Sequence, residues 1–176
     1  MAQGMPLSED VLRQYIGGSG LGAWLLLAEG GATTEPLSPE APLIFAFSPL
    51  VGSPLTTSAK FAVVSRSPLT GRFNDSLASS GFAIAGKQAG CDAIVLVGKA
   101  AKLSVLVIDD GNVRLEPADD VAGDSCPVTE EKLRARLGTN YRIASIGPAG
   151  ERAVRYATIS HDGRHGWNGG TSGSRS

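Results

Sequence analysis

Residues 160–165 form the densest group of side chains in the sequence that could do chemistry. The group contains Ser160, His161, Asp162 and His165. Imidazoles and a carboxylate are common metal ligands, and serine, histidine and aspartate are the parts of a nucleophilic triad. Adjacent residues, however, cannot fold back on one another as nucleophile, base and orienting group must. The spacing is typical of a loop, so the sequence favours a surface turn over a metal site or a triad.

Residues 18–23 read Gly-Ser-Gly-Leu-Gly-Ala and fit the G-x-G-x-x-A pattern of a dinucleotide site. That pattern binds a pyrophosphate only when it follows a strand, and residues 11–16 have a helical pattern instead. The acidic residue at the required distance, Glu40, lies in a proline-rich connector. The sequence therefore favours a tight turn between two helices.

The chain has two cysteines, Cys91 and Cys126, which are too few for a four-cysteine iron–sulfur cluster or a structural zinc site. No cation or histidine flanks Cys91, so a small packed thiol is expected there. Asn74-Asp75-Ser76 forms a glycosylation sequon but is interpreted as a polar turn.

The composition excludes several classes of protein. The 16 Lys and Arg against 17 Asp and Glu give a net charge of −1, which does not favour a nucleic-acid partner. The apolar stretch 23–28 is far shorter than the roughly 20 residues that a bilayer requires. Residues 1–10 do not resemble a signal peptide, so we expect a cytoplasmic protein without a membrane partner.

The elements that must position these groups are short. The 23 Gly and 10 Pro among 176 residues argue against a helical bundle. The residue pattern predicts an α+β fold with antiparallel or mixed β-sheets and a few short helices, in one domain over 1–165 with a flexible Gly/Ser-rich tail over 166–176. Helices are expected at 8–16, 22–27, 81–88 and 129–137. Strands are expected at 43–47, 61–65, 93–97, 103–108, 113–115, 142–146 and 154–159, with a hairpin turn at Asp110-Gly111.

Several loop motifs follow one another along the chain, and their order is more specific to a protein family than any single motif. They are residues 17–23, 36–40, 42–46, 65–71, 89–94, 98–100, 146–151 and 154–157. In this order they resemble the N-terminal domain of the aldehyde ferredoxin oxidoreductase family, tungsten- or molybdenum-dependent enzymes with a bis-pterin cofactor. The resemblance implies an α+β domain whose sheets form a base under a tungstopterin or molybdopterin.

The sequence departs from the family pattern at the positions that contact the cofactor. Lys60 stands where the family has an arginine, and 77–80 read Leu-Ala-Ser-Ser where the family has Asn-Ser-Gly-Gly. Residues 167–170 read Trp-Asn-Gly-Gly where the family has Gly-Arg-Gly-Gly. The cofactor-binding residues that the resemblance implies are Lys60, Ser79, Ser80, Asn168, Gly169 and Gly170.

Two functions follow from the resemblance. The first is the cofactor-binding domain of an oxidoreductase whose cluster and substrate domains lie on a partner chain. On this interpretation we expect none of the catalytic residues in this chain. The second is a degenerate domain that has lost the pterin and binds a small ligand or a protein, with a homodimer expected because its sheet edges and apolar surface are exposed.

Overall fold

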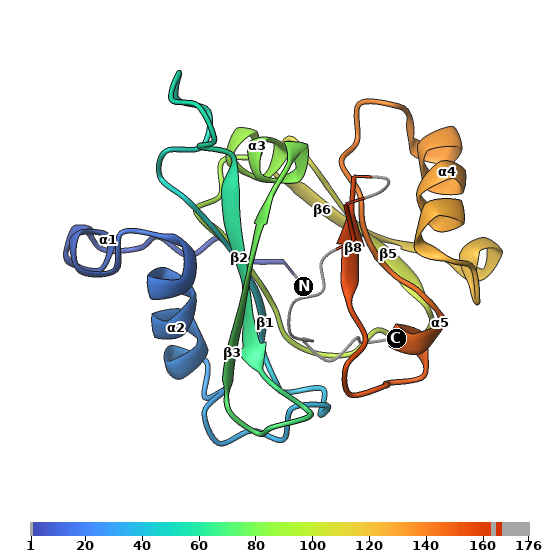
Figure 1. Ribbon diagram of the computed structural model, residues 1–176, viewed down its shortest axis with the longest axis horizontal. Helices are drawn as coiled ribbons and strands as arrows, with labels where there is room; N and C mark the ends of the chain where they lie inside the picture. The colour runs from blue at the N-terminus through green and yellow to red at the C-terminus, as the bar shows by residue number, and fades with distance from the viewer. Residues whose placement is uncertain (1, 163–164, 167–176) are drawn as a thin grey trace.

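The computed structural model of the protein describes residues 2–162 and 165–166. It is an α+β fold in which the described strands form three antiparallel sheets with short helices around them (Figure 1). The helices α1 and α2 lie on one side of the molecule and α4 on the other. No helix in the described ranges is long and apolar enough to cross a membrane.

Two helices open the chain. Helix α1 spans Glu9–Tyr15 and begins at Ser8, whose hydroxyl accepts a hydrogen bond from the Val11 N–H. Helix α2 spans Gly18–Ala28 and follows directly. A turn between two helices is present, but it lies at Ile16 and Gly17; residues 18–23, where the turn was expected, form the start of α2.

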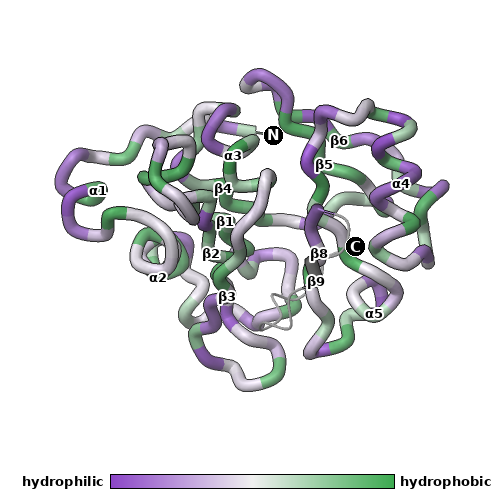
Figure 2. The backbone as a smooth tube through the Cα atoms, turned by 45° about the horizontal axis from the view of Figure 1, so that its top comes forward, coloured by the Kyte–Doolittle hydropathy of each residue, from purple (hydrophilic) through white to green (hydrophobic). Residues whose placement is uncertain are grey.

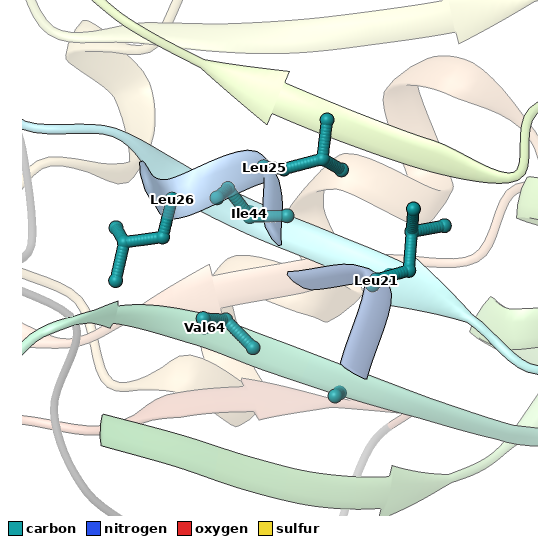
Figure 3. Close-up of a cluster of buried hydrophobic side chains, with 7 residues drawn as sticks. Leu21, Leu25, Leu26, Ile44 and Val64 are labelled. Atoms are coloured by element: carbon teal, nitrogen blue, oxygen red, sulfur yellow. The ribbon is translucent and has the colours of Figure 1, made fainter. Parts of the chain in front are cut away.

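The central sheet has the strand order β3-β2-β1-β4. Strand β1 spans Leu43–Phe47, β2 Lys60–Arg66, β3 Phe73–Ser79 and β4 Ala93–Leu96. Helix α2 covers one face, where Leu21, Leu25 and Leu26 pack on Ile44 and Val64 (Figure 3). A Cβ on Gly22 would lie 2.6 Å from a Val64 methyl carbon, so glycine allows this close approach of helix and strand.

The opposite face of the central sheet is aromatic. Helix α3 spans Gly81–Gln88 and brings Phe82 against Phe45, Phe47 and Phe61, with ring centroids 5.3–6.5 Å apart. Gly86 of α3 lies directly on the Phe47 ring. We call this group of four phenylalanines the aromatic cluster; it joins the sheet to the second half of the chain.

Replacing Gly86 with alanine should destabilise the fold. The added Cβ would overlap the ring of Phe47, which is 1% exposed and cannot move aside. Overpacking of this kind costs about 1–3 kcal/mol, which exceeds the roughly 1 kcal/mol that alanine gains over glycine in a helix. Urea unfolding should show a lower midpoint for Gly86→Ala, whereas Gln88→Ala, at an exposed position of α3, should stay within about 0.5 kcal/mol of the wild type.

The second half of the chain forms two smaller sheets. Strands β5 (Ser104–Asp109) and β6 (Asn112–Pro117) form the predicted hairpin, and β7 (Ala144–Ile146), β8 (Ile159–His161) and β9 (His165–Gly166) form a three-stranded sheet. The remaining helices are η1 (Asp119–Val121), α4 (Cys126–Leu137) and α5 (Pro148–Glu151). Helix α4 is mostly hydrophilic (Figure 2), and its buried residues are Thr129, Glu130 and Leu133.

Two further expectations about local structure are wrong. Asn74-Asp75-Ser76 lies inside β3 rather than in a polar turn, because β3 pairs with β2 along its whole length. The strand expected at 154–159 is confined to β8, and residues 154–158 are turns and irregular backbone. Beyond Gly166, the tail expected over 166–176 lies outside the described residues.

Candidate cofactor-binding face

Lys60 and Ser79 are direct cross-strand partners at the open end of the β2–β3 hairpin. Both residues are exposed, and residues paired directly across two strands project to the same face of a sheet. Leu77 follows the same alternation opposite Ala62 and is 51% exposed. The ammonium and hydroxyl groups thus stand side by side next to an apolar side chain. We call Lys60, Leu77 and Ser79 the Lys60 face.

The Lys60 face presents an ammonium and a hydroxyl that are in no ion pair or hydrogen bond with other side chains of the described residues. Among the ion pairs of the described residues none involves Lys60, and none of the hydrogen bonds there engages the Ser79 hydroxyl. The carboxylate that shares the face, Asp75, accepts a 2.6 Å hydrogen bond from the Ser19 hydroxyl at the start of α2. An anionic group such as a phosphate could therefore bind to the ammonium and hydroxyl together.

Ser80 has a structural role. It is the N-cap of α3, and its hydroxyl accepts a 3.1 Å hydrogen bond from the Phe82 N–H. The same N–H also lies 3.1 Å from the Asp162 carboxylate, which approaches from the end of β8. The structure therefore brings Lys60 and Ser79 together and commits the Ser80 hydroxyl to the helix cap, while Asn168, Gly169 and Gly170 lie outside the described residues.

The double cap should make Ser80 and Asp162 partly interchangeable. Loss of an N-cap lowers the free energy of unfolding by about 0.5–2 kcal/mol. Ser80→Ala and Asp162→Ala should each cause a loss at the low end of this range, because the other side chain still accepts the hydrogen bond from the Phe82 N–H. The double variant should lose more than the sum of the two changes, because Phe82 N–H then has no acceptor. Urea unfolding of the four proteins measures this coupling, and strictly additive losses would contradict the shared cap.

The surface turn predicted around His161 is wrong for that residue. His161 is 4% exposed, lies in β8 opposite Ala144, and packs edge-on against Phe61 with ring centroids 5.5 Å apart. The alternation of Ile159 and His161 about Ser160 was the signal that could have indicated a buried strand. In the described part of the chain no three potential metal ligands gather around one point.

The two cysteines are free thiols, both half-buried. Cys91 packs against the hydrophobic cluster around Phe47 and Phe61, which confirms the expected packed thiol. Cys126 is the first residue of α4 and lies beside the Ser145 carbonyl, with Sγ 3.8 Å from the oxygen. Two separate thiols of this kind do not form a cluster site.

Comparison with known proteins identifies the fold and the family. Residues 2–174 match the family described as "Aldehyde ferredoxin oxidoreductase, N-terminal domain". The chain belongs to the aldehyde ferredoxin oxidoreductase family. It is 40% identical over 156 residues to the tungsten-containing aldehyde ferredoxin oxidoreductase of Pyrococcus furiosus and 36% identical to that of Thermococcus kodakarensis, covering 88% of this chain in each case.

Two further relatives extend the family likeness. The WOR-like subunit of an aliphatic sulfonate oxidoreductase from Pyrococcus furiosus is 31% identical over 189 residues. The solved "Active site complex BamBC of Benzoyl Coenzyme A reductase in complex with 1,5 Dienoyl-CoA" contains a chain with a TM-score of 0.89 and 31% identity. That match covers 96% of this chain but 26% of the other. Our chain likewise spans 26% of the length of the tungsten-containing aldehyde ferredoxin oxidoreductases named above.

Proposed function

We propose that this chain is the cofactor-binding domain of an aldehyde ferredoxin oxidoreductase-like enzyme and binds a tungstopterin or a molybdopterin. The observation that carries the proposal is the pairing of Lys60 with Ser79, an exposed cation beside an exposed hydroxyl. Relatives at 36–40% identity are tungsten-containing enzymes, which supports a metal–pterin as the ligand.

The residues of the Lys60 face fit an anionic pterin. The Lys60 ammonium would neutralise a phosphate oxygen, the Ser79 hydroxyl would donate a hydrogen bond, and Leu77 would pack against the apolar part of the ligand. By the family resemblance, Asn168, Gly169 and Gly170 would add backbone and amide contacts. When bound, the metal–pterin would supply the redox chemistry, while these residues bind and orient it.

The rest of such an enzyme would come from a partner chain. An iron–sulfur cluster held by four cysteines needs more thiols than Cys91 and Cys126 supply. The chain corresponds to about a quarter of its relatives' length. We propose that a partner carries the cluster and substrate domains of such an enzyme.

A degenerate domain without pterin is the alternative. Leu77, on the Lys60 face, replaces the family's asparagine and removes an amide donor. On this account the same face binds another small ligand or a protein.

The test is the metal and pterin content of the protein. The chain is purified without oxygen from cells supplied with tungstate and molybdate, alone and co-expressed with a candidate partner, and is analysed for both metals and for oxidised-pterin fluorescence. Near-stoichiometric metal and pterin are expected. Absence of both in every preparation would overturn the proposal in favour of the alternative.

A further inference from the structure

Strand β6 is an exposed edge with an alternation of apolar and charged residues. Five of its six residues are exposed, including Leu115 at 60% and Val113 at 40%. Its one strand neighbour in the described structure is β5. An edge strand with exposed apolar residues is a template for pairing with another strand.

The hairpin geometry shows which backbone groups of β6 point outward. The turn residues Asp110 and Gly111 have φ of 45° and 80°, as in a two-residue type I′ turn. Such a turn closes on a hydrogen-bonded pair, here Asp109 with Asn112, and hydrogen-bonded pairs then alternate along the ladder. The N–H and C=O groups of Val113 and Leu115 therefore point away from β5.

The charges on β6 have opposite signs and lie on the other face from Leu115. Arg114 and Glu116 stand two residues apart, with Arg114 Nε 2.9 Å from Glu116 Oε1. This hydrogen bond raises the pKa of the Arg114 guanidinium, a group that is charged at any ordinary pH even without it. Charges of a single sign along an edge strand repel a second copy of that strand. Alternating opposite charges instead allow the strand to pair with its own copy.

We propose that β6 pairs antiparallel with β6 of a second copy of this chain, with Leu115 opposite Leu115 on the two-fold axis. This register places Arg114 of each copy opposite Glu116 of the other. Registers centred on Arg114 or Glu116 place like charges opposite each other. A register centred on Val113 sets Leu115 against Gly111 of the turn and leaves the charges without opposite partners. The result is a four-stranded sheet in the order β5-β6-β6-β5.

Pro117 limits the length of this pairing. It has no N–H, and its carbonyl already accepts a 3.1 Å hydrogen bond from Arg136. The carbonyl keeps a second lone pair for Val113 of the other copy. The ladder between the two copies thus consists of two backbone hydrogen bonds between the Leu115 residues and one hydrogen bond from the N–H of each Val113 to the Pro117 carbonyl of the other copy. So few hydrogen bonds suit a weak and reversible dimer.

A cysteine substitution tests the register directly. A directly opposed, hydrogen-bonded pair has Cα atoms about 5.5 Å apart, within the range of a disulfide. Leu115→Cys should therefore give a covalent dimer under mild oxidation, whereas Val113→Cys, opposite Pro117 in this register, should give far less. Equal cross-linking of the two variants, or none with Leu115→Cys, would overturn the proposal.

Charge exchange tests the interface in solution by analytical ultracentrifugation of the full chain at low salt. Arg114→Glu should raise the dimer dissociation constant by about tenfold, because each change is made twice in the symmetric pair. Adding Glu116→Arg to Arg114→Glu should restore the wild-type constant. The control Phe73→Lys, on the exposed edge strand β3, should leave it unchanged. A monomer at every concentration, or a dimer unaffected by Arg114→Glu, would contradict β6 pairing.

Discussion

Phe61→Ala should lower the free energy of unfolding by about 3–5 kcal/mol, the largest loss that we expect from one substitution. Phe61 is 2% exposed and contacts Phe45, Phe47 and Phe82 of the aromatic cluster as well as His161 of β8. Its removal would leave a cavity where the central sheet meets the three-stranded sheet, so both layers should lose support together.

Denaturant unfolding followed by circular dichroism measures this loss. The matched control is Phe73→Ala in β3, where the phenylalanine is 50% exposed and should contribute less than about 1 kcal/mol. If Phe61→Ala were no more destabilising than the control, the aromatic cluster would not be what joins the two halves of the chain.

Lys60→Glu should reduce pterin retention by about 10- to 100-fold. A hydrogen bond to a charged group contributes about 1.5–3 kcal/mol, and the substituted carboxylate would also repel an anionic cofactor. Lys60→Arg should retain the cofactor at least as well as the wild type, because the guanidinium can form a bidentate contact with phosphate. Pterin fluorescence per mole of protein after gel filtration gives the comparison.

The control for this prediction is Lys102→Glu, which makes the same charge change at an exposed lysine in the loop before β5. It should leave pterin retention unchanged. Equal losses in Lys60→Glu and Lys102→Glu would show a general effect of net charge and would contradict a specific role for Lys60.

Locally encoded elements could be predicted from the sequence. Helix α1 is set by the Ser8 cap, and the β5–β6 hairpin by the Asp110-Gly111 turn, and each signal lies within a few residues of the element it defines. Strand β3 could not be predicted in this way, because Asn74-Asp75-Ser76 has the composition of a turn. Pairing with β2 along seven residues overrides that local preference.

The geometry of the candidate site depends on β3, the strand that the sequence pattern did not predict. Lys60 and Ser79 were expected at the cofactor by resemblance, but their direct pairing follows from β3 and its register with β2. The cap of α3 by Asp162 and the packing of His161 on Phe61 join segments about 80 and 100 residues apart, which no local pattern encodes. Long-range contacts of this kind are visible only in the folded chain.

The most direct test of a cofactor on the Lys60 face is the position of the metal in crystals of the anaerobically purified chain. Anomalous diffraction at the tungsten or molybdenum absorption edge gives that position without assuming any contact. We expect a single strong peak beside the open end of the β2–β3 hairpin, on the side of Lys60 and Ser79. A metal peak elsewhere on the molecule, or metal-free crystals of protein loaded with tungstate and molybdate, would contradict the account.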